Sequence, residues 1–160
     1  MQAGWSIRKA GVEDLEDLIR LRLALHRTTR GVEKLEGEET LAEANRRYLL
    51  RALPAGEFHA WVGVVAGGRA VATSGLVAFS RPPMPETLAC LEAYILNMYT
   101  EPEWRGRGIA RALFTEVVRF ARELGVGRLL LHATAEGRPL YESMGFKLNP
   151  KSMEWTPSGE

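Results

Sequence analysis

Cysteine, lysine and long apolar runs are all scarce in this chain of 160 residues. Cys90 is the only cysteine, so no disulfide can form within the chain, and we expect a reducing, cytoplasmic environment. No apolar run reaches the roughly 18 residues that a membrane-spanning helix needs, and nothing like a signal peptide opens the sequence. We therefore expect no membrane partner.

An excess of charge of one sign is also missing. Acidic and basic residues nearly balance, at a formal net charge of +1, so the chain lacks the field that draws nucleic acid to a protein. Its histidines, His26, His59 and His132, do not have the spacing of metal ligands. The composition therefore predicts no nucleic-acid partner and no metal.

The apolar residues follow the periods of strands and helices. They predict a single α+β domain over residues 1–160, with the element order β-α-α-β-β-β-α-β-α-β. The predicted strands are 5–9, 58–65, 71–79, 87–100, 128–132 and 153–156, and the predicted helices are 12–27, 39–53, 110–124 and a short one within 136–146. We expect a hairpin turn at 66–69 and an end to the second helix before Pro54.

The run from Arg105 to Ala110 places a glycine-rich turn between a strand and an amphipathic helix. Backbone N–H groups at a helix start are unpaired, and the helix dipole makes their surroundings positive. Gly106 and Gly108 let an anion approach the backbone, while Arg105 and Arg107 add positive charge. The run therefore predicts a phosphate site, although the two arginines could instead be solvated surface charges.

Two common kinds of phosphate loop do not fit this run. A Walker loop ends in Gly-Lys-Ser/Thr, which does not occur here. A dinucleotide-binding loop has a third glycine where Arg111 stands, and an acidic residue at the end of the next strand, where His132 and Ala133 stand. The form that remains is Arg-x-x-Gly-x-Ala, read from Arg105 through Gly108 to Ala110.

This form resembles the signature Gln/Arg-x-x-Gly-x-Gly/Ala of the GNAT superfamily of N-acetyltransferases. A second motif of that superfamily is a helix that carries a tyrosine and ends a few residues later in Gly-Phe, which Tyr141, Gly145 and Phe146 match. The two motifs and the strands between them span about Leu88 to Phe146. The N-terminal half of the chain agrees only in the order of its elements.

The resemblance implies a fold and a cosubstrate. The fold is an α/β sandwich whose mixed sheet of about six to seven strands splays between strands four and five, after a bulge in strand four, with about four flanking helices. The cosubstrate is acetyl-CoA, whose pantetheine arm enters beside strand four while its pyrophosphate lies on the glycine-rich loop. The residues implied in binding it are Met98, Tyr99, Thr100, Arg105, Gly106, Arg107, Gly108, Ile109, Ala110, Arg111, Thr134, Arg138 and Tyr141.

The resemblance also implies direct transfer of the acetyl group to a primary amine. The Met98 amide would donate to the carbonyl oxygen as negative charge develops on it, and Tyr141 would protonate the leaving thiolate. Tyr141 could instead be a packing residue. Glu92 is the first candidate for the base that deprotonates the amine, and His59 is the second. Thr134 stands where the superfamily often has asparagine, which leaves one contact with the cofactor open.

The acceptor is not encoded by any motif, and it could be a small molecule or a peptide. The segment from Glu33 to Glu43 is acidic, which would favour a cationic amine if it walled the acceptor site, but its acids also suit a solvated helix start. The acyl-chain length stays open as well. The alternative function is a non-catalytic, acyl-CoA-binding regulatory protein with the same fold. An apolar final strand around Met153 and Trp155 predicts a homodimer.

Overall fold

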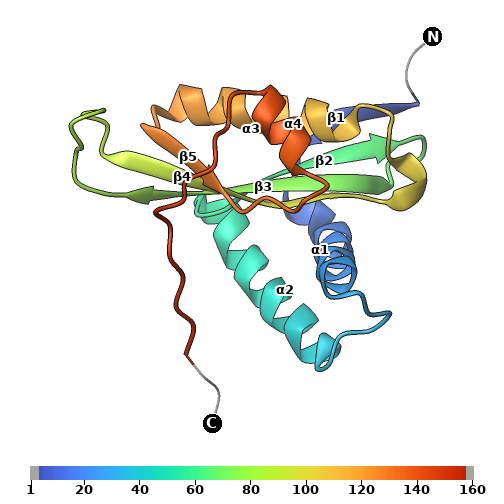
Figure 1. Ribbon diagram of the computed structural model, residues 1–160. Coiled ribbons are helices and arrows are strands. Elements are labelled where there is room, and N and C mark those ends of the chain that lie inside the picture. The colour runs from blue at the N-terminus through green and yellow to red at the C-terminus, as the bar shows by residue number, and fades with distance from the viewer. Residues whose placement is uncertain (1–3, 158–160) are drawn as a thin grey trace.

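The computed structural model describes residues 4–157, in which alternating apolar residues build one mixed sheet of five strands (Figure 1). The strands lie side by side in the order of the sequence, and all neighbours are antiparallel except the last pair, which is parallel. They are β1 (Trp5–Lys9), β2 (His59–Val65), β3 (Ala70–Ser80), β4 (Leu91–Thr100) and β5 (Arg128–Leu131).

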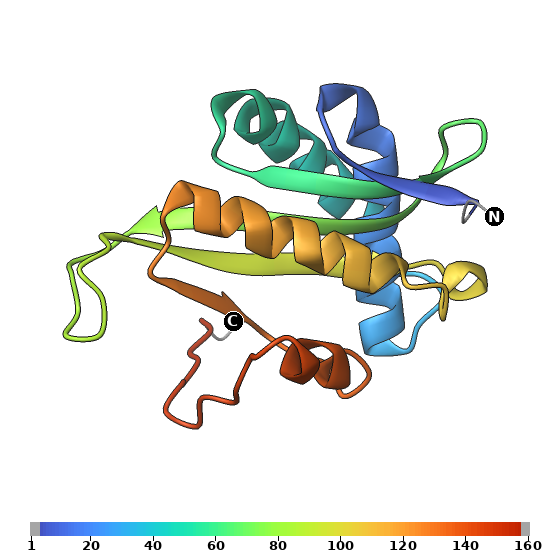
Figure 2. The same cartoon turned by 90° about the horizontal axis from the view of Figure 1, so that it is seen from above.

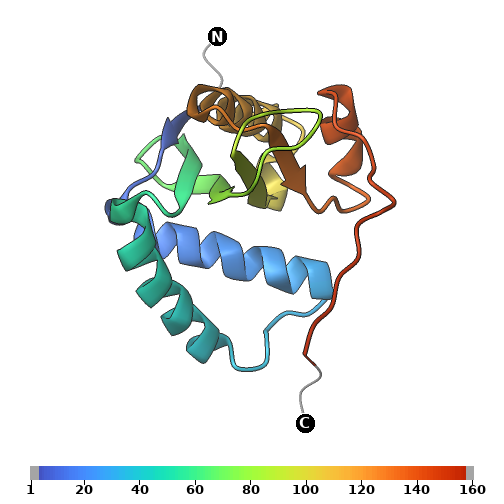
Figure 3. The same cartoon turned by 90° about the vertical axis from the view of Figure 1, so that its left-hand side faces the viewer.

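Helices cover both faces of this sheet, because both faces carry buried apolar side chains (Figures 1 and 3). On one face lie α1 (Leu15–Arg30) and α2 (Glu38–Ala55), which follow the short helix η1 (Val12–Asp14). On the other lie α3 (Ile109–Leu124), which runs lengthwise along the strands at a slight slant (Figure 2), and α4 (Arg138–Ser143). A short helix, η2 (Pro102–Trp104), joins β4 to the loop before α3.

The amphipathic pattern of the helices explains this layering. Leu113, Phe114 and Val117 recur at helical spacing, are buried and anchor α3 to its face of the sheet. Leu18 and Leu21 do the same for α1 on the opposite face. The sheet therefore separates two apolar cores. The side chain of a β4 residue packs into one core or the other according to the face of the sheet on which it lies.

A bulge interrupts β4, as the resemblance to the superfamily implies. Thr73 pairs with Tyr99 and Gly75 pairs with Leu96, so one more residue lies between the partners on β4 than on β3. Asn97 takes up the extra length in a left-handed conformation with φ of 60°, which asparagine tolerates better than most residues.

The sheet opens beyond the bulge. The pairing of β4 with β5 ends at Ile95 and Leu131, and β5 itself ends there, whereas β4 continues along β3 as far as Thr100. Within residues 4–157, the last five residues of β4 thus have a strand neighbour on one side only. This confirms the predicted splay between strands four and five.

The predicted count of six to seven strands is wrong for the part of the chain that the structure describes. Residues 153–156, expected to close the sheet, form no strand, and the outer edge of β5 has no partner there. Met153 is 96% exposed and Trp155 83% exposed, so the alternation of apolar residues in this segment does not reflect burial against the sheet.

The helices and the hairpin agree with the prediction more closely. The second helix, however, continues through Pro54 to Ala55 and ends at Gly56, whose φ is 71°. Proline at this position removes only one hydrogen bond in the last turn, which the helix tolerates because it ends two residues later. Among the helices of residues 4–157, none is both long enough and apolar enough to cross a bilayer.

Candidate functional site

The loop between β4 and α3 is shaped by two glycines. Gly106 has φ of 72° and Gly108, the residue before the first turn of α3, has φ of 83°, both in the region that favours glycine. A Cβ at either position would meet nothing within 4 Å, so the space in front of the loop is open. The first N–H groups of α3 therefore face a volume that a phosphate could fill.

Three guanidinium groups surround this loop without a carboxylate partner among residues 4–157. Arg105 donates through Nε to the carbonyl oxygen of Thr100 at 2.9 Å, and Arg111 donates to Ser143 Oγ at 3.0 Å. Arg107 lies over the Trp104 ring, 4.6 Å from its centroid. These contacts orient the cations but leave their charge uncompensated, so the loop is a strongly positive region beside the positive end of a helix.

The bulge frees the backbone of Met98. In the ladder with β3, Asn97 and Met98 have no partner, and β5 has already ended at Leu131. Among the residues that the structure describes, no neighbouring strand pairs with this stretch of β4. The Met98 side chain packs into the core under α3, which holds the backbone in place. This part of β4 can therefore donate and accept hydrogen bonds with a bound molecule.

Tyr141 lies on α4 with its ring packed against Phe114, 5.0 Å between centroids, and only 8% of its surface is exposed. Burial raises the pKa of Tyr141 above its usual value of 10, and no charged group in residues 4–157 opposes the shift. A tyrosine is already protonated at neutral pH, and the raised pKa extends the pH range over which the phenol can donate a proton.

Tyr141 lines a cavity of about 730 Å³ between β5, α4 and the C-terminal segment, together with two other predicted cofactor residues, Thr134 and Arg138. Thr134 Oγ1 accepts a hydrogen bond from the Gly137 amide at 3.1 Å, and the Thr134 carbonyl accepts from the Arg138 amide at 3.0 Å. The hydroxyl of Thr134 therefore holds the start of α4 in place, and Arg138 is paired with Glu142.

The structure does not bring the two candidate bases to this place. Glu92 is 2% exposed and pairs with Arg81 at 2.6 Å and Arg128 at 2.8 Å, at the start of β4. Met98 lies six positions further along the strand, a span of about 20 Å. His59 packs at the start of β2 against Phe120, at 4.6 Å between ring centroids. Both placements favour structural roles.

A second cavity, of about 260 Å³, lies between α1, α2 and β4, on the face opposite to α3. Its polar members are Arg22, Asn45, Tyr48 and Asn97, and Asn97 is the residue that forms the bulge in β4. The guanidinium of Arg22 donates to Asn97 Oδ1. Sequence reasoning missed this cavity, because its residues come from α1, α2, β4 and Phe58 before β2, and no local motif connects them.

The acidic segment from Glu33 to Glu43 does not line this second cavity. Glu38 pairs with Arg27 at 2.6 Å, and Glu43 pairs with Arg46 at 2.7 Å. These pairs compensate the negative charge locally, as expected for a solvated helix start. No group of three or more histidine, cysteine, aspartate or glutamate side chains in residues 4–157 is arranged to hold a metal ion.

Comparison with known proteins gives one family. The model of the acetyltransferase (GNAT) family matches residues 20–146, which include the loop, the bulge, Tyr141 and the second cavity. A crystal structure of a GCN5-related N-acetyltransferase from Ralstonia eutropha has a TM-score of 0.83 and 33% identity, covering 96% of this chain and 99% of that one. A predicted acetyltransferase from Clostridium acetobutylicum, solved with acetyl-CoA, has a TM-score of 0.81 and 27% identity, over 95% and 96% of the two chains.

Curated relatives match over shorter stretches. A probable N-acetyltransferase family 8 member 5 from Mus musculus is 31% identical over 97 residues, which are 59% of this chain and 40% of the relative. A glucosamine 6-phosphate N-acetyltransferase from Trypanosoma brucei brucei is 27% identical over 60 residues, 38% of this chain and 41% of the relative. The chain thus spans less than half the length of these curated relatives.

Proposed function

Because this chain belongs to the acetyltransferase (GNAT) family, we propose that it transfers an acetyl group from acetyl-CoA to a primary amine. The transfer is direct, with both substrates bound at the same time. The observation that supports this most strongly is the continuity of the loop before α3 with the unpaired backbone of β4 at Met98. The chain thereby offers phosphate donors directly after a stretch of free strand backbone.

The residues around this surface fit the chemistry of acetyl-CoA. The first N–H groups of α3, from Arg107 to Arg111, would bind the pyrophosphate, with Arg105 at the edge. The free backbone from Met98 to Thr100 would pair with the amides of the pantetheine arm. When bound, acetyl-CoA supplies an acetyl group activated as a thioester.

Two residues of the chain then act on the reacting atoms. The Met98 N–H, freed by the bulge, donates a hydrogen bond to the acetyl carbonyl oxygen and stabilises the negative charge that develops there. Tyr141 would donate its proton to the sulfur that leaves. The proton that the attacking amine loses would pass to water, from which Tyr141 would be reprotonated. Glu92 is not part of this proposal, because its carboxylate is paired with two arginines about 20 Å away along β4.

The acceptor amine would approach from the opposite face of the sheet, through the cavity between α1 and α2. That cavity contains Asn97, the neighbour of Met98, and so adjoins the reacting centre. The two cavities would then serve the two substrates separately.

The experiment that tests the proposal is a screen of amines with acetyl-CoA, in which the release of free thiol and the mass of the product are both followed. We expect one acetylated amine for each thiol released. A non-catalytic, acyl-CoA-binding regulator, the second candidate, would bind acetyl-CoA in calorimetry but release no thiol with any amine.

A homodimer completes the proposal. Met153 and Trp155 are exposed, and within residues 4–157 the outer edge of β5 is unpaired, so a second copy could cover both. Light scattering at micromolar concentration should give twice the mass of the chain, and a monomeric mass would argue against this assembly.

A further inference from the structure

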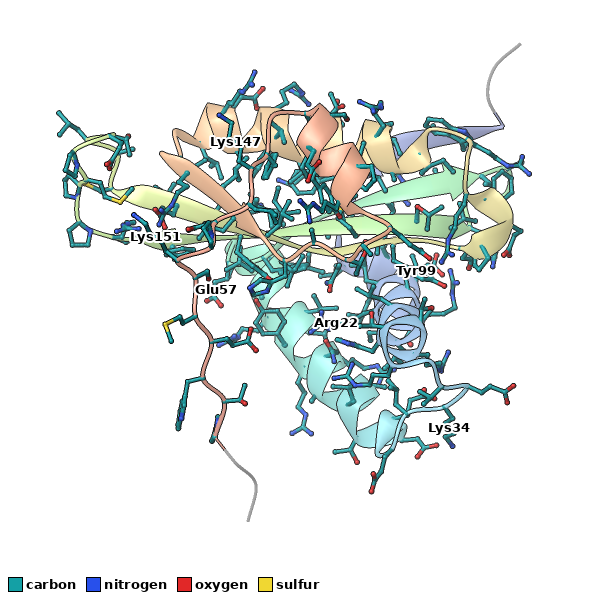
Figure 4. The ribbon with its side chains drawn as sticks, in the orientation of Figure 1. Arg22, Lys34, Glu57, Tyr99, Lys147 and Lys151 are labelled. Atoms are coloured by element: carbon teal, nitrogen blue, oxygen red, sulfur yellow. The ribbon has the colours of Figure 1, made fainter. Side chains whose placement is uncertain are left out.

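Arg22 is the residue of the second cavity whose surroundings are hardest to explain without a ligand. It lies on α1, between that helix, α2 and the sheet (Figure 4). Its guanidinium donates to Asn97 Oδ1, but its buried Nε has no hydrogen-bond partner among residues 4–157. A buried N–H without an acceptor is unfavourable, so a partner is missing from this place.

The charge of Arg22 is also uncompensated. Its neighbours on the same helix, Arg20 and Arg27, pair with Glu101 and Glu38, whereas no carboxylate of residues 4–157 pairs with Arg22. Burial lowers the pKa of its guanidinium, and the nearby Tyr48 hydroxyl is the only titratable group that opposes this shift. His26, whose pKa is lowered by burial and by Arg22 and Arg30, also lies near and supplies no negative charge.

The remaining lining indicates what else the missing partner carries. Leu49, Phe58 and Leu96 form an apolar wall, while Asn45 and Tyr48 add an amide and a hydroxyl. A volume of about 260 Å³ suits a small molecule and falls just below the usual range of ligand pockets.

We propose that the acceptor is a small amine that also carries an oxyanion, a carboxylate or a phosphate monoester, and that Arg22 binds this oxyanion. The proposal rests on the function proposed above, in which this cavity receives the acceptor. Binding at Arg22 would place the amine of the same molecule near Asn97 and the free backbone of Met98. Arg22 would thus be a specificity-determining residue that selects acidic amines and repels polycationic ones.

The test compares acceptors that differ only in the oxyanion. The matched pairs are L-phenylalanine with L-phenylalaninamide, and glucosamine 6-phosphate with glucosamine, while spermidine represents polycationic amines. With acetyl-CoA in excess, kcat/KM from thiol release should be at least about tenfold higher for the acidic member of one pair. The pair that shows this preference identifies the oxyanion as a carboxylate or as a phosphate monoester. Spermidine should be the poorest acceptor.

The variant Arg22→Gln should remove this preference. We expect kcat/KM for the acidic acceptor to fall about tenfold or more, with the neutral acceptor and the KM for acetyl-CoA unchanged. The midpoint of thermal unfolding should not fall, since an uncompensated buried charge is removed. Arg47→Gln is the control, because Arg47 lies on α2 but is 75% exposed and pairs with Glu43 at 3.8 Å; it should leave all these values as they are.

The outcomes separate the two proposals. If the neutral member of each pair is acetylated as well as the acidic one, or if Arg22→Gln keeps the preference, the assignment of Arg22 is wrong while the acetyltransferase function stands. If acetyl-CoA binds but no amine in a broad panel releases thiol, the function itself is wrong, and the assignment falls with it. If Arg22→Gln does not fold, the ratio of kcat/KM for the acidic and neutral acceptors, measured on the unmodified protein, still tests whether the acceptor carries an oxyanion.

Discussion

The loop before α3 and the cavity beside α1 present the same chemical group in two different ways. Both hold guanidinium groups without carboxylate partners among residues 4–157, and both adjoin the bulge of β4. The loop is made from consecutive residues, 105–111, whereas Arg22 and its partner Asn97 are 75 positions apart. The proposed phosphate site is therefore a local feature of the sequence, and the proposed acceptor site is a feature of the folded chain.

The two regions also differ in exposure. The arginines of the loop are at the surface, where salt screens their attraction for an anion. The Nε of Arg22 is buried, so salt screens its attraction for an anion less. Its charge therefore discriminates more strongly between charged and neutral ligands. A cofactor with several phosphates suits the first arrangement, and a small acceptor with one charge suits the second.

The largest expected effect comes from Tyr141, the proposed acid, which lies in neither region. Tyr141→Phe removes only the hydroxyl and keeps the ring contact with Phe114. Because general-acid assistance typically contributes about 10²- to 10⁴-fold, kcat should fall well beyond tenfold while the Kd for acetyl-CoA stays nearly constant. Burial raises the pKa of Tyr141, so the unmodified enzyme should not lose this acid between about pH 7 and about pH 9.

The outcome that would remove Tyr141 from the reaction is a variant with unchanged kcat when the chemical step limits the rate. Tyr141 would then be a packing residue, and water would supply the proton. A thioester with a more acidic leaving thiol should reduce the defect of Tyr141→Phe, because its thiolate needs less protonation.

The next effect should be confined to the loop. Gly108→Asp places a carboxylate at the start of α3, where the phosphates would lie, so the Kd for acetyl-CoA should rise about tenfold or more in calorimetry. Gly108→Ala is the matched control, since it imposes the same strain at φ of 83° without the charge and meets no atom within 4 Å. Equal affinities of Gly108→Asp and the unmodified protein would mean that phosphate binds elsewhere.

A smaller effect, on the stability of the fold, should concern both regions at once. Glu101 follows β4, is buried, and joins Arg20 of α1 to Arg69, with Arg69 at 2.7 Å. Glu101→Gln takes the paired carboxylate from Arg69 and one of two from Arg20, which keeps Asp17 at 2.9 Å. It should lower the free energy of unfolding by about 1–3 kcal/mol, or roughly 2–4 °C of melting temperature per kcal/mol. Glu116→Gln, which breaks an exposed pair with Arg119, should change stability little.

The smallest expected effect tests the screening of the loop. Arg107→Gln should raise the Kd for acetyl-CoA only a few-fold, because the side chain is exposed. The salt dependence of this Kd should become weaker in the variant, whereas the salt dependence of acceptor KM should not change. A salt dependence identical to that of the unmodified protein would show that Arg107 does not face the phosphates.

Sequence reasoning succeeded where a few neighbouring residues determine the geometry. The glycine-rich loop and the amphipathic face of α3 follow from local pattern. The splay after Ile95 was implied only by the resemblance to the superfamily. Sequence reasoning failed where contacts with residues distant in the sequence determine the structure. The alternation around Met153 resembles a strand, but a strand needs a neighbour, and among residues 4–157 this segment has none.

The same distinction explains the candidate site. Glu92 was a reasonable candidate base while only its place on a strand was known, but its two arginine partners come from loop and strand positions that no motif links to it. Arg22 was one arginine among many in the sequence. Only the fold shows that its neighbours find carboxylates and that it does not.

The most direct test of the division between the two regions is an initial-rate study in which acetyl-CoA and the acidic acceptor are both varied. It would compare the unmodified protein with Gly108→Asp and Arg22→Gln. The account predicts that Gly108→Asp raises the KM for acetyl-CoA alone and that Arg22→Gln raises the KM for the acceptor alone. If both substitutions raise the same KM, the two regions do not bind different substrates, and the account is contradicted.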